Sequence, residues 1–114
     1  MAILHATKDN FDELVNTDYA IVDFYGDFCG ACVELAPIFA AAGSDYGVLR
    51  FIKVNTSEER ELSERFNIHY IPCTIYFRGG KEVNRAVGFM GRETMDKMVA
   101  ALLYEYPFPE LKEE

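Results

Sequence analysis

The chain has 114 residues, a length that fits one compact domain and is too short for two domains that each have their own hydrophobic core. Half of the residues are hydrophobic and 14% are aromatic, a composition that excludes an intrinsically disordered chain. The net charge of −8 argues against a nucleic-acid binder, which usually carries a basic patch, and against a protein that binds an anionic membrane surface.

The first part of the chain predicts a strand, a short helix and a second strand. Residues 2–5 fit a short strand, and Thr7 is the expected N-cap of a helix in which apolar residues recur at helical spacing over 11–15. Residues 19–25 are a nearly continuous apolar run, which is typical of a strand that helices bury on both faces. Gly26 ends this run.

A longer helix, a strand and another helix are expected next. The helix should span 29–43, with Pro37 inside it as the cause of a kink. Residues 49–55 form the next predicted strand. Thr56 followed by Glu59 has the spacing of a capping box, which predicts that a short helix begins there.

The last part of the chain predicts a hairpin and a helix. Residues 73–77 are apolar and β-prone, and 82–87 should be their partner strand across the turn Arg78-Gly79-Gly80-Lys81. The clearest helix of the chain follows, because apolar residues recur on one face from Met95 to Tyr106.

The order of these elements, βαβαβαββα, defines an α/β fold. Strands that alternate with helices should be parallel, with right-handed crossovers, and the Gly-Gly hairpin should add an antiparallel edge. We therefore expect a central mixed sheet covered by helices on both faces. The domain should span residues 1–104, followed by an irregular tail over 105–114 that contains two prolines and ends in charged residues.

Two of the three cysteines stand at a position that favours redox chemistry. Cys29 and Cys32 follow a predicted strand and open a helix, where residues three apart lie on one face and come within disulfide range after a modest adjustment. The unpaired N–H groups and the positive dipole of a first helical turn favour a thiolate at the leading cysteine. Cys29 is then the nucleophile, and Cys32 is the thiol that resolves the mixed disulfide.

A CxxC pair can also be half of a zinc site, which would want a second CxxC or paired histidines. The remaining candidate ligands are scattered singly, at Cys73, His5 and His69, so redox chemistry is favoured. Three cysteines in a chain with no visible signal peptide do not form a disulfide framework. No apolar run approaches the roughly 20 residues of a membrane span. We therefore expect a cytoplasmic protein.

The stretch from Val22 to Cys32, Val-Asp-Phe-Tyr-Gly-Asp-Phe-Cys-Gly-Ala-Cys, resembles the active-site stretch of the thioredoxin family. Four further motifs stand in order at the family's other marked positions: Ala36-Pro37, Lys53-Val54-Asn55, Ile71-Pro72 and Val87-Gly88. The resemblance covers about residues 2–104. It implies a thioredoxin fold with Pro72 in the cis form beside the dithiol. It also implies reduction of disulfides on other proteins, with electrons supplied by a dedicated reductase.

The resemblance assigns roles to residues around the dithiol. Asp23 is a carboxylate among apolar strand residues, which predicts that it is buried; a water-exposed edge position is the alternative. Burial should raise its pKa, and the resemblance makes it the acceptor of the Cys32 proton. Lys53 would lie near Asp23 and tune it, or is a solvated lysine at a strand edge. A cis Pro72 would turn the backbone of Ile71 outward to pair with an extended client segment. Gly88 would permit close backbone approach in the same groove, or is a plain turn glycine.

The sequence departs from the family pattern around the dithiol. Phe28, like Tyr25, stands where tryptophan is usual, and Ala31 replaces the usual proline between the cysteines. Alanine should loosen that turn and make the dithiol less strongly reducing. Tyr70 and Phe89 could form, with Phe28, an aromatic rim around the dithiol that prefers apolar client segments; ordinary packing is the alternative.

Cys73 directly follows Pro72 and leaves several interpretations open. It is a small, buried, inert thiol on the simplest interpretation. On the others it is an alternative disulfide partner, a regulatory thiol, or a third ligand beside Cys29 and Cys32 for zinc or an iron–sulfur cluster.

We therefore expect a monomeric thiol–disulfide oxidoreductase that reduces client proteins through Cys29 and Cys32, assisted by Asp23 and Lys53. It should need no organic cofactor and no metal, and should be reduced by a donor of the thioredoxin-reductase type. The alternatives are a thioredoxin-fold interaction module and a metal or iron–sulfur carrier. The expected client-binding residues are Phe28, Gly30, Ala31, Tyr70, Ile71, Pro72, Gly88 and Phe89.

Overall fold

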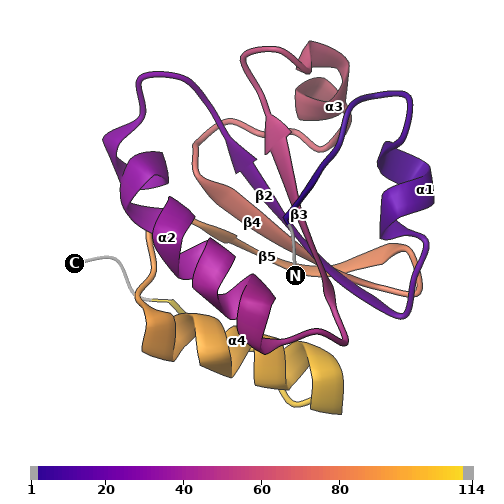
Figure 1. Ribbon diagram of the computed structural model, residues 1–114, viewed down its shortest axis with the longest axis vertical. Coiled ribbons are helices and arrows are strands. Elements are labelled where there is room, and N and C mark those ends of the chain that lie inside the picture. The colour runs from indigo at the N-terminus through magenta and orange to yellow at the C-terminus, as the bar shows by residue number, and fades with distance from the viewer. Residues whose placement is uncertain (1–2, 112–114) are drawn as a thin grey trace.

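The computed structural model describes residues 3–111, and its elements follow the predicted order βαβαβαββα (Figure 1). No helix within this range is both long and apolar enough to cross a membrane. The strands are β1 (Leu4–His5), β2 (Tyr19–Tyr25), β3 (Arg50–Asn55), β4 (Cys73–Arg78) and β5 (Lys81–Val87). The helices are α1 (Phe11–Val15), α2 (Gly30–Asp45), α3 (Arg60–Arg65) and α4 (Arg92–Tyr104).

The strands form one mixed sheet in the order β1-β3-β2-β4-β5. The strands β1, β3 and β2 are parallel, whereas β4 runs antiparallel to β2 and β5 antiparallel to β4. The predicted mixed sheet is confirmed, and its antiparallel part already begins between β2 and β4. The register places Asp23 of the central strand directly between Lys53 on β3 and Thr74 on β4.

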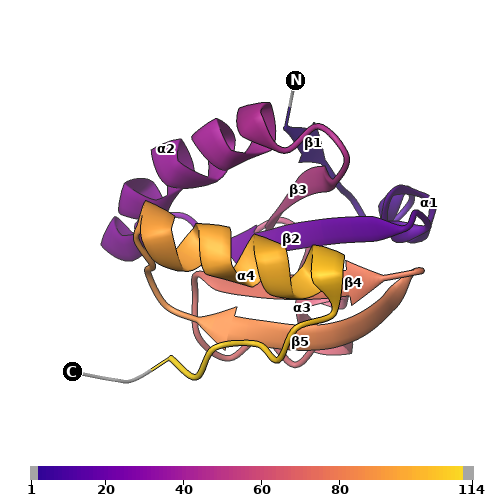
Figure 2. The same cartoon turned by 90° about the horizontal axis from the view of Figure 1, so that it is seen from below.

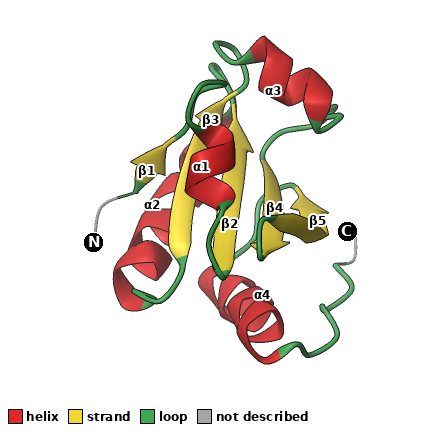
Figure 3. Ribbon diagram, turned by 90° about the vertical axis from the view of Figure 1, so that its right-hand side faces the viewer, coloured by secondary structure: helices red, strands yellow, loops and turns green. Residues whose placement is uncertain are grey.

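Helices cover both faces of the sheet, as the apolar run of β2 predicts (Figures 2 and 3). Under α2 and α4, Ile21 of β2 packs with Leu35 and Phe39, which lie four residues apart on one side of α2. On the other face, Phe24 packs with Phe11 of α1, whose rings lie 6.3 Å apart, and Leu62 of α3 belongs to the same cluster. Successive side chains of β2 point to opposite faces of the sheet, so every second residue contacts the same layer of helices.

The boundaries of the first strand and of α2 differ slightly from the prediction. The first strand spans two of the four predicted residues, and residue 2 lies outside the described range. Gly43 does not end α2, which continues to Asp45. A Cβ at Gly43 would lie 2.9 Å from Cδ1 of Ile3 and 3.3 Å from the Phe51 side chain, so Gly43 sits in a close packing contact and is not a stop signal.

Both predicted N-caps are wrong. The helix α1 begins at Phe11 with Asn10 as its N-cap, while the Thr7 carbonyl accepts the Phe11 N–H and the Thr7 hydroxyl accepts the Asp9 N–H at 3.3 Å, one turn before the helix. No side-chain hydrogen bond caps α3, because the Thr56 hydroxyl donates to the Tyr25 carbonyl at 2.9 Å instead. In both places side-chain oxygens, which can bond locally or at long range, have partners other than the predicted helix terminus.

The chain after α4 is irregular as far as residue 111 and runs back beside β5 (Figure 2). Helix α4 ends at Tyr104, because Glu105 adopts a left-handed conformation (φ 56°), so the predicted apolar face stops short of Tyr106. Phe108 packs on Tyr76, with 5.6 Å between the ring centroids. The division at residue 104 stays a prediction, and residues 112–114 of the expected tail lie outside the described range.

Candidate active site

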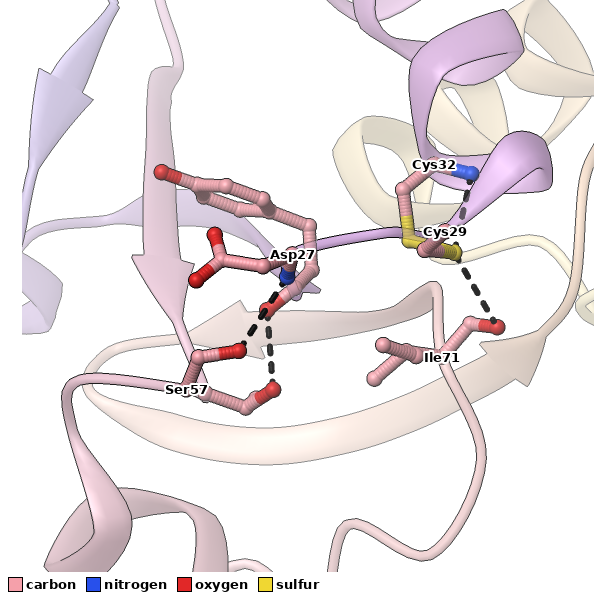
Figure 4. The surroundings of a disulfide bond; sticks show 7 residues. Asp27, Cys29, Cys32, Ser57 and Ile71 are labelled. Carbon is pink, nitrogen blue, oxygen red and sulfur yellow. Dashed lines mark hydrogen bonds between the residues drawn. A yellow bond between two sulfur atoms is a disulfide. The ribbon is translucent and has the colours of Figure 1, made fainter.

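Cys29 and Cys32 form a disulfide at the start of α2, with 5.2 Å between their Cα atoms. Cys29 is the N-cap of this helix and has extended backbone geometry, while Cys32 is buried on the inner side of the first turn. The Cys29 sulfur accepts the backbone N–H of Cys32 at 3.2 Å (Figure 4). The sulfur therefore occupies the position of an N-capping oxygen, where N–H groups that lack a helical partner point toward it.

The Ile71–Pro72 loop approaches the disulfide from below in Figure 4. The peptide bond between these residues is cis, as the family resemblance implies. The Ile71 carbonyl oxygen lies 3.9 Å from the Cys29 sulfur. A Cβ at Gly26 would lie only 2.7 Å from the Ile71 side chain, so glycine at that position lets the two loops meet.

Gly88 belongs to a third segment that joins this site. Its N–H donates to the Pro72 carbonyl at 2.7 Å, which ties the loop after β5 to the proline loop. Its φ of +99° requires glycine, and no described atom lies within 4 Å of the Cβ that another residue would place there. Backbone conformation, rather than crowding by the protein itself, therefore explains this glycine.

The loop that leads into Cys29 is fixed to the end of β3. Thr56 donates to the Tyr25 carbonyl through both its N–H and its hydroxyl, and Ser57 Oγ accepts the N–H of Asp27 at 3.1 Å (Figure 4). Asn55 also donates to the Asp27 carboxylate at 3.3 Å. These bonds connect the carboxyl ends of two neighbouring strands and so hold the loop in front of the disulfide.

Asp23 is completely buried in β2, as the sequence predicts. Within residues 3–111, neither of its carboxylate oxygens has a hydrogen-bond partner. Burial raises the pKa of Asp23 from 3.8 to about 6, and the positive charge of Lys53 opposes part of this rise. The Lys53 ammonium lies 4.4 Å from the centre of the Tyr25 ring, so the lysine acts on the carboxyl through its field and is half-buried rather than fully solvated.

Asp23 and Cys32 lie on surfaces that face each other. Asp23 is two residues after Ile21 and shares its side of the sheet, and Cys32 is three residues before Leu35 on the inner side of α2. Ile21 and Leu35 belong to the same packed cluster. Helix α2 runs in the opposite direction to β2, so later residues of β2 lie toward earlier residues of α2. Asp23, after Ile21, and Cys32, before Leu35, therefore lie toward the same end of the two elements.

Three exposed aromatic side chains flank the segments that meet here. Phe28 precedes Cys29 and is fully exposed, Tyr70 precedes Ile71 and is 73% exposed, and Phe89 follows Gly88 and is 49% exposed. Such exposure does not fit the alternative of ordinary packing. The predicted client preference of this aromatic rim (Phe28, Tyr70 and Phe89) stays a prediction.

Cys73 faces the opposite side of the sheet. It is buried beside Phe24 and Ile75, in the layer under α1 and α3. Burial raises the pKa of its thiol to about 11. Nowhere in the described part of the chain do three His, Cys, Asp or Glu side chains come together in a way that could hold a metal ion. The three-thiol ligand set considered from the sequence is therefore not favoured.

Sequence reasoning missed two polar residues that lie next to Asp23. Thr74 and Tyr76 of β4 are both completely buried on the same side of the sheet as Asp23. The available signal was two hydroxyl-bearing residues at alternate positions of the apolar strand Cys-Thr-Ile-Tyr-Phe.

Comparisons with known proteins agree with this geometry. The sequence model of the thioredoxin family matches residues 2–101. The thioredoxin of Staphylococcus haemolyticus is 32% identical over 100 residues, which cover 87% of this chain and 96% of the relative. The thioredoxin of Mycoplasmoides gallisepticum is 32% identical over 93 residues, which cover 81% of this chain and 93% of the relative.

Solved structures show the same fold. The crystal structure of Malassezia sympodialis thioredoxin superposes with a TM-score of 0.77 at 22% identity and covers 90% of each chain. Membership of one family thus explains the sheet, the helices on both of its faces and the disulfide-capable pair at the start of α2. The chain belongs to the thioredoxin family and is a thiol–disulfide oxidoreductase that carries the pair Cys29–Cys32.

Proposed function

We propose that this protein reduces disulfide bonds of client proteins through its Cys-Gly-Ala-Cys site, with Cys29 as the attacking thiolate. The observation that carries the proposal is the position of the Cys29 sulfur, which caps a 16-residue helix and accepts a backbone N–H. Both the N–H group and the helix dipole stabilise negative charge on that sulfur. Cys29 is also the more exposed of the two cysteines, so a client can reach it first.

The reaction is a two-step exchange that moves two electrons to the client. The Cys29 thiolate attacks one sulfur of the client disulfide, a mixed disulfide forms, and the other client sulfur leaves as a thiolate that takes up a proton. Cys32 then loses its proton and attacks the Cys29 sulfur. This step breaks the mixed disulfide, releases the second client thiolate and leaves the Cys29–Cys32 disulfide.

Asp23 is the proposed acceptor of the Cys32 proton. Its raised pKa of about 6 leaves it mostly ionised at neutral pH and makes it a stronger base than an ordinary carboxylate. The positive charge of Lys53 keeps that pKa from rising further. We assign Lys53 a tuning role on this basis.

The client is proposed to bind as an extended segment along the proline loop. The Ile71 carbonyl next to the disulfide is positioned to pair with such a segment. The aromatic rim would add apolar contacts on either side. The client-contacting residues proposed are Phe28, Gly30, Ala31, Tyr70, Ile71, Pro72, Gly88 and Phe89.

The electrons are proposed to come from a donor of the thioredoxin-reductase type, because this chain itself supplies only thiols. We place the protein in the cytoplasm, where dithiols are kept reduced. Residues 1–104 are proposed to form the working domain, to which the segment after 104 is an appendage that packs through Phe108.

A trapping experiment with oxidised insulin tests the proposal. Cys32→Ser should hold insulin as a mixed disulfide on Cys29, since the attacking thiol remains and the resolving thiol is lost. Mass spectrometry of non-reduced samples reads out the adduct and its cysteine. Cys29→Ser is the matched control and should form no adduct. An adduct on Cys73, or equal adducts with both variants, would contradict the assignment of Cys29.

A further inference from the structure

The face of the sheet that carries Asp23 contains a polar group with no counterpart on the other face. Asp23 and Thr74 are both completely buried, and they stand directly opposite each other on β2 and β4. Opposed residues of antiparallel strands have Cβ atoms about 5 Å apart. A rotation of the Thr74 side chain about its Cα–Cβ bond is therefore enough to bring its hydroxyl toward the carboxyl.

In this structure the Thr74 hydroxyl pairs with another hydroxyl. Thr74 Oγ1 and the Tyr76 hydroxyl oxygen are 2.8 Å apart, and either can be the donor. The Tyr76 hydroxyl also lies 3.9 Å from the sulfur of Met90, which is a weak acceptor. The Tyr76 ring is held by Phe108, so the phenol has a fixed place from which to bond Thr74.

These contacts allow two directions of hydrogen bonding. In the first, Thr74 donates to Tyr76, and Tyr76 donates to Met90. In the second, the Thr74 side chain rotates away from Tyr76 and donates to Asp23, while Tyr76 still donates to Met90. A hydroxyl carries one proton and two lone pairs, so each direction satisfies both hydroxyls. The second direction also supplies a donor to a buried carboxylate that otherwise has none.

We propose that Thr74 is a positioning residue of this site, whose hydroxyl turns from Tyr76 to donate a hydrogen bond to Asp23 when that carboxyl is ionised. The Asp23 role rests on the proposed function, whereas the hydrogen bond itself does not require turnover. Of the other titratable groups, Lys53 faces Asp23 from β3 and Tyr76 faces it from β4, whereas the Cys29–Cys32 pair of α2 is a disulfide and does not titrate. The helix α4 presents methionines to this face.

The test is a carbon-13 NMR titration of the Asp23 carboxyl in the oxidised protein. Thr74→Val removes the hydroxyl at nearly constant shape and should raise the Asp23 pKa by about one unit, because a donor to the ionised form is lost. Thr74→Ser keeps the hydroxyl and should titrate like the wild type. Thr74→Ala is a second hydroxyl-free variant that should also raise the pKa, in case valine disturbs folding.

Tyr76→Phe distinguishes the proposed Thr74–Asp23 hydrogen bond from a general effect of removing a buried hydroxyl near Asp23. Without the phenol, Thr74 has only Asp23 to bond, so the Asp23 pKa should stay unchanged or fall. A rise equal to that of Thr74→Val would overturn the proposal, as would an unchanged pKa in both hydroxyl-free Thr74 variants. The pH profile of insulin reduction is measured in parallel. If the NMR pKa moves and the profile does not, the hydrogen bond is supported and the proposed role of Asp23 as a base fails.

Discussion

Asp23 and Cys73 lie on neighbouring strands, are both buried, and have pKa values that burial raises. They differ in the side of the sheet that they face. Asp23 points into the layer under α2, with Lys53 and Thr74 beside it and the disulfide at the start of that helix. Cys73 points into an apolar layer with Phe24 and Ile75.

This difference shows that two buried ionisable groups on neighbouring strands can have very different electrostatic surroundings. The thiol of Cys73 has a pKa of about 11 and stays protonated at physiological pH, so it behaves as a small apolar side chain. The carboxyl of Asp23 has a pKa of about 6, close to neutrality, because burial and the field of Lys53 act in opposite directions. What matters is which partners share the buried face.

The largest expected difference is in the rate of insulin reduction, between variants of Cys29 at the start of α2 and of Cys73 on the opposite face of the sheet. Cys29→Ser should lower the rate of insulin reduction by at least about 1,000-fold, because Cys29 is the partly exposed thiol that caps α2, whereas Cys32 and Cys73 are buried. Cys73→Ser should keep the rate within about twofold of the wild type, because that thiol faces away from the site. A comparable loss in both variants would remove the distinction between the two faces.

The second contrast concerns the pH dependence of stability. Folding raises the Asp23 pKa from 3.8 to about 6, so the folded protein binds this proton more tightly than the unfolded chain. The stability that results is fully present below about pH 4 and is lost as the pH rises through about 6. Asp23→Asn should therefore gain about 2.5 kcal/mol in free energy of unfolding, relative to the wild type, between pH 4 and pH 8.

Urea unfolding of both proteins at each pH measures this gain, and the constant cost of a buried amide cancels in the comparison. Cys73→Ser is the control, since its thiol does not titrate in this range and its offset from the wild type should not vary with pH. A constant offset for Asp23→Asn would show that the buried carboxyl is not the group that titrates near pH 6.

The third contrast is in thiol reactivity. With its pKa raised from 9.0 to about 11, the Cys73 thiolate at pH 8 should be roughly 100-fold scarcer than that of an ordinary cysteine. The reduced native protein should therefore react with Ellman's reagent at Cys29 and Cys32 quickly, and at Cys73 only after denaturation. Rapid reaction of all three native thiols would mean that Cys73 is an accessible, reactive thiol.

The smallest expected effect tests the turn between the cysteines. Proline at position 31 should restrict the reduced loop and favour the disulfide, so Ala31→Pro should make the midpoint potential more negative by about 10 to 20 mV. A glutathione redox titration measures this shift. Equal midpoints would show that Ala31 does not set the redox poise, and Cys73→Ser again serves as the control without an expected shift.

Local sequence patterns were sufficient for much of the fold and part of the site. The apolar run of β2, the Gly-Gly hairpin and the apolar face of α4 predict their elements because each signal lies within one segment. The same holds for Cys29 and Cys32, whose spacing and position after a strand place both at a helix start. Burial of Asp23 followed from its apolar neighbours in sequence.

The sequence by itself thus determined the elements, their order and the reactive pair, because these depend on neighbours along the chain. The tertiary structure decided which long-range partners meet. In the folded chain the Thr56 hydroxyl donates to the Tyr25 carbonyl instead of capping a helix, and the Ile71 carbonyl lies next to the Cys29 sulfur. The register of β2 with β4 decided the rest, because a shift by one residue would exchange the faces of Thr74 and Cys73. Only that pairing puts the hydroxyl, and not the thiol, on the side of Asp23.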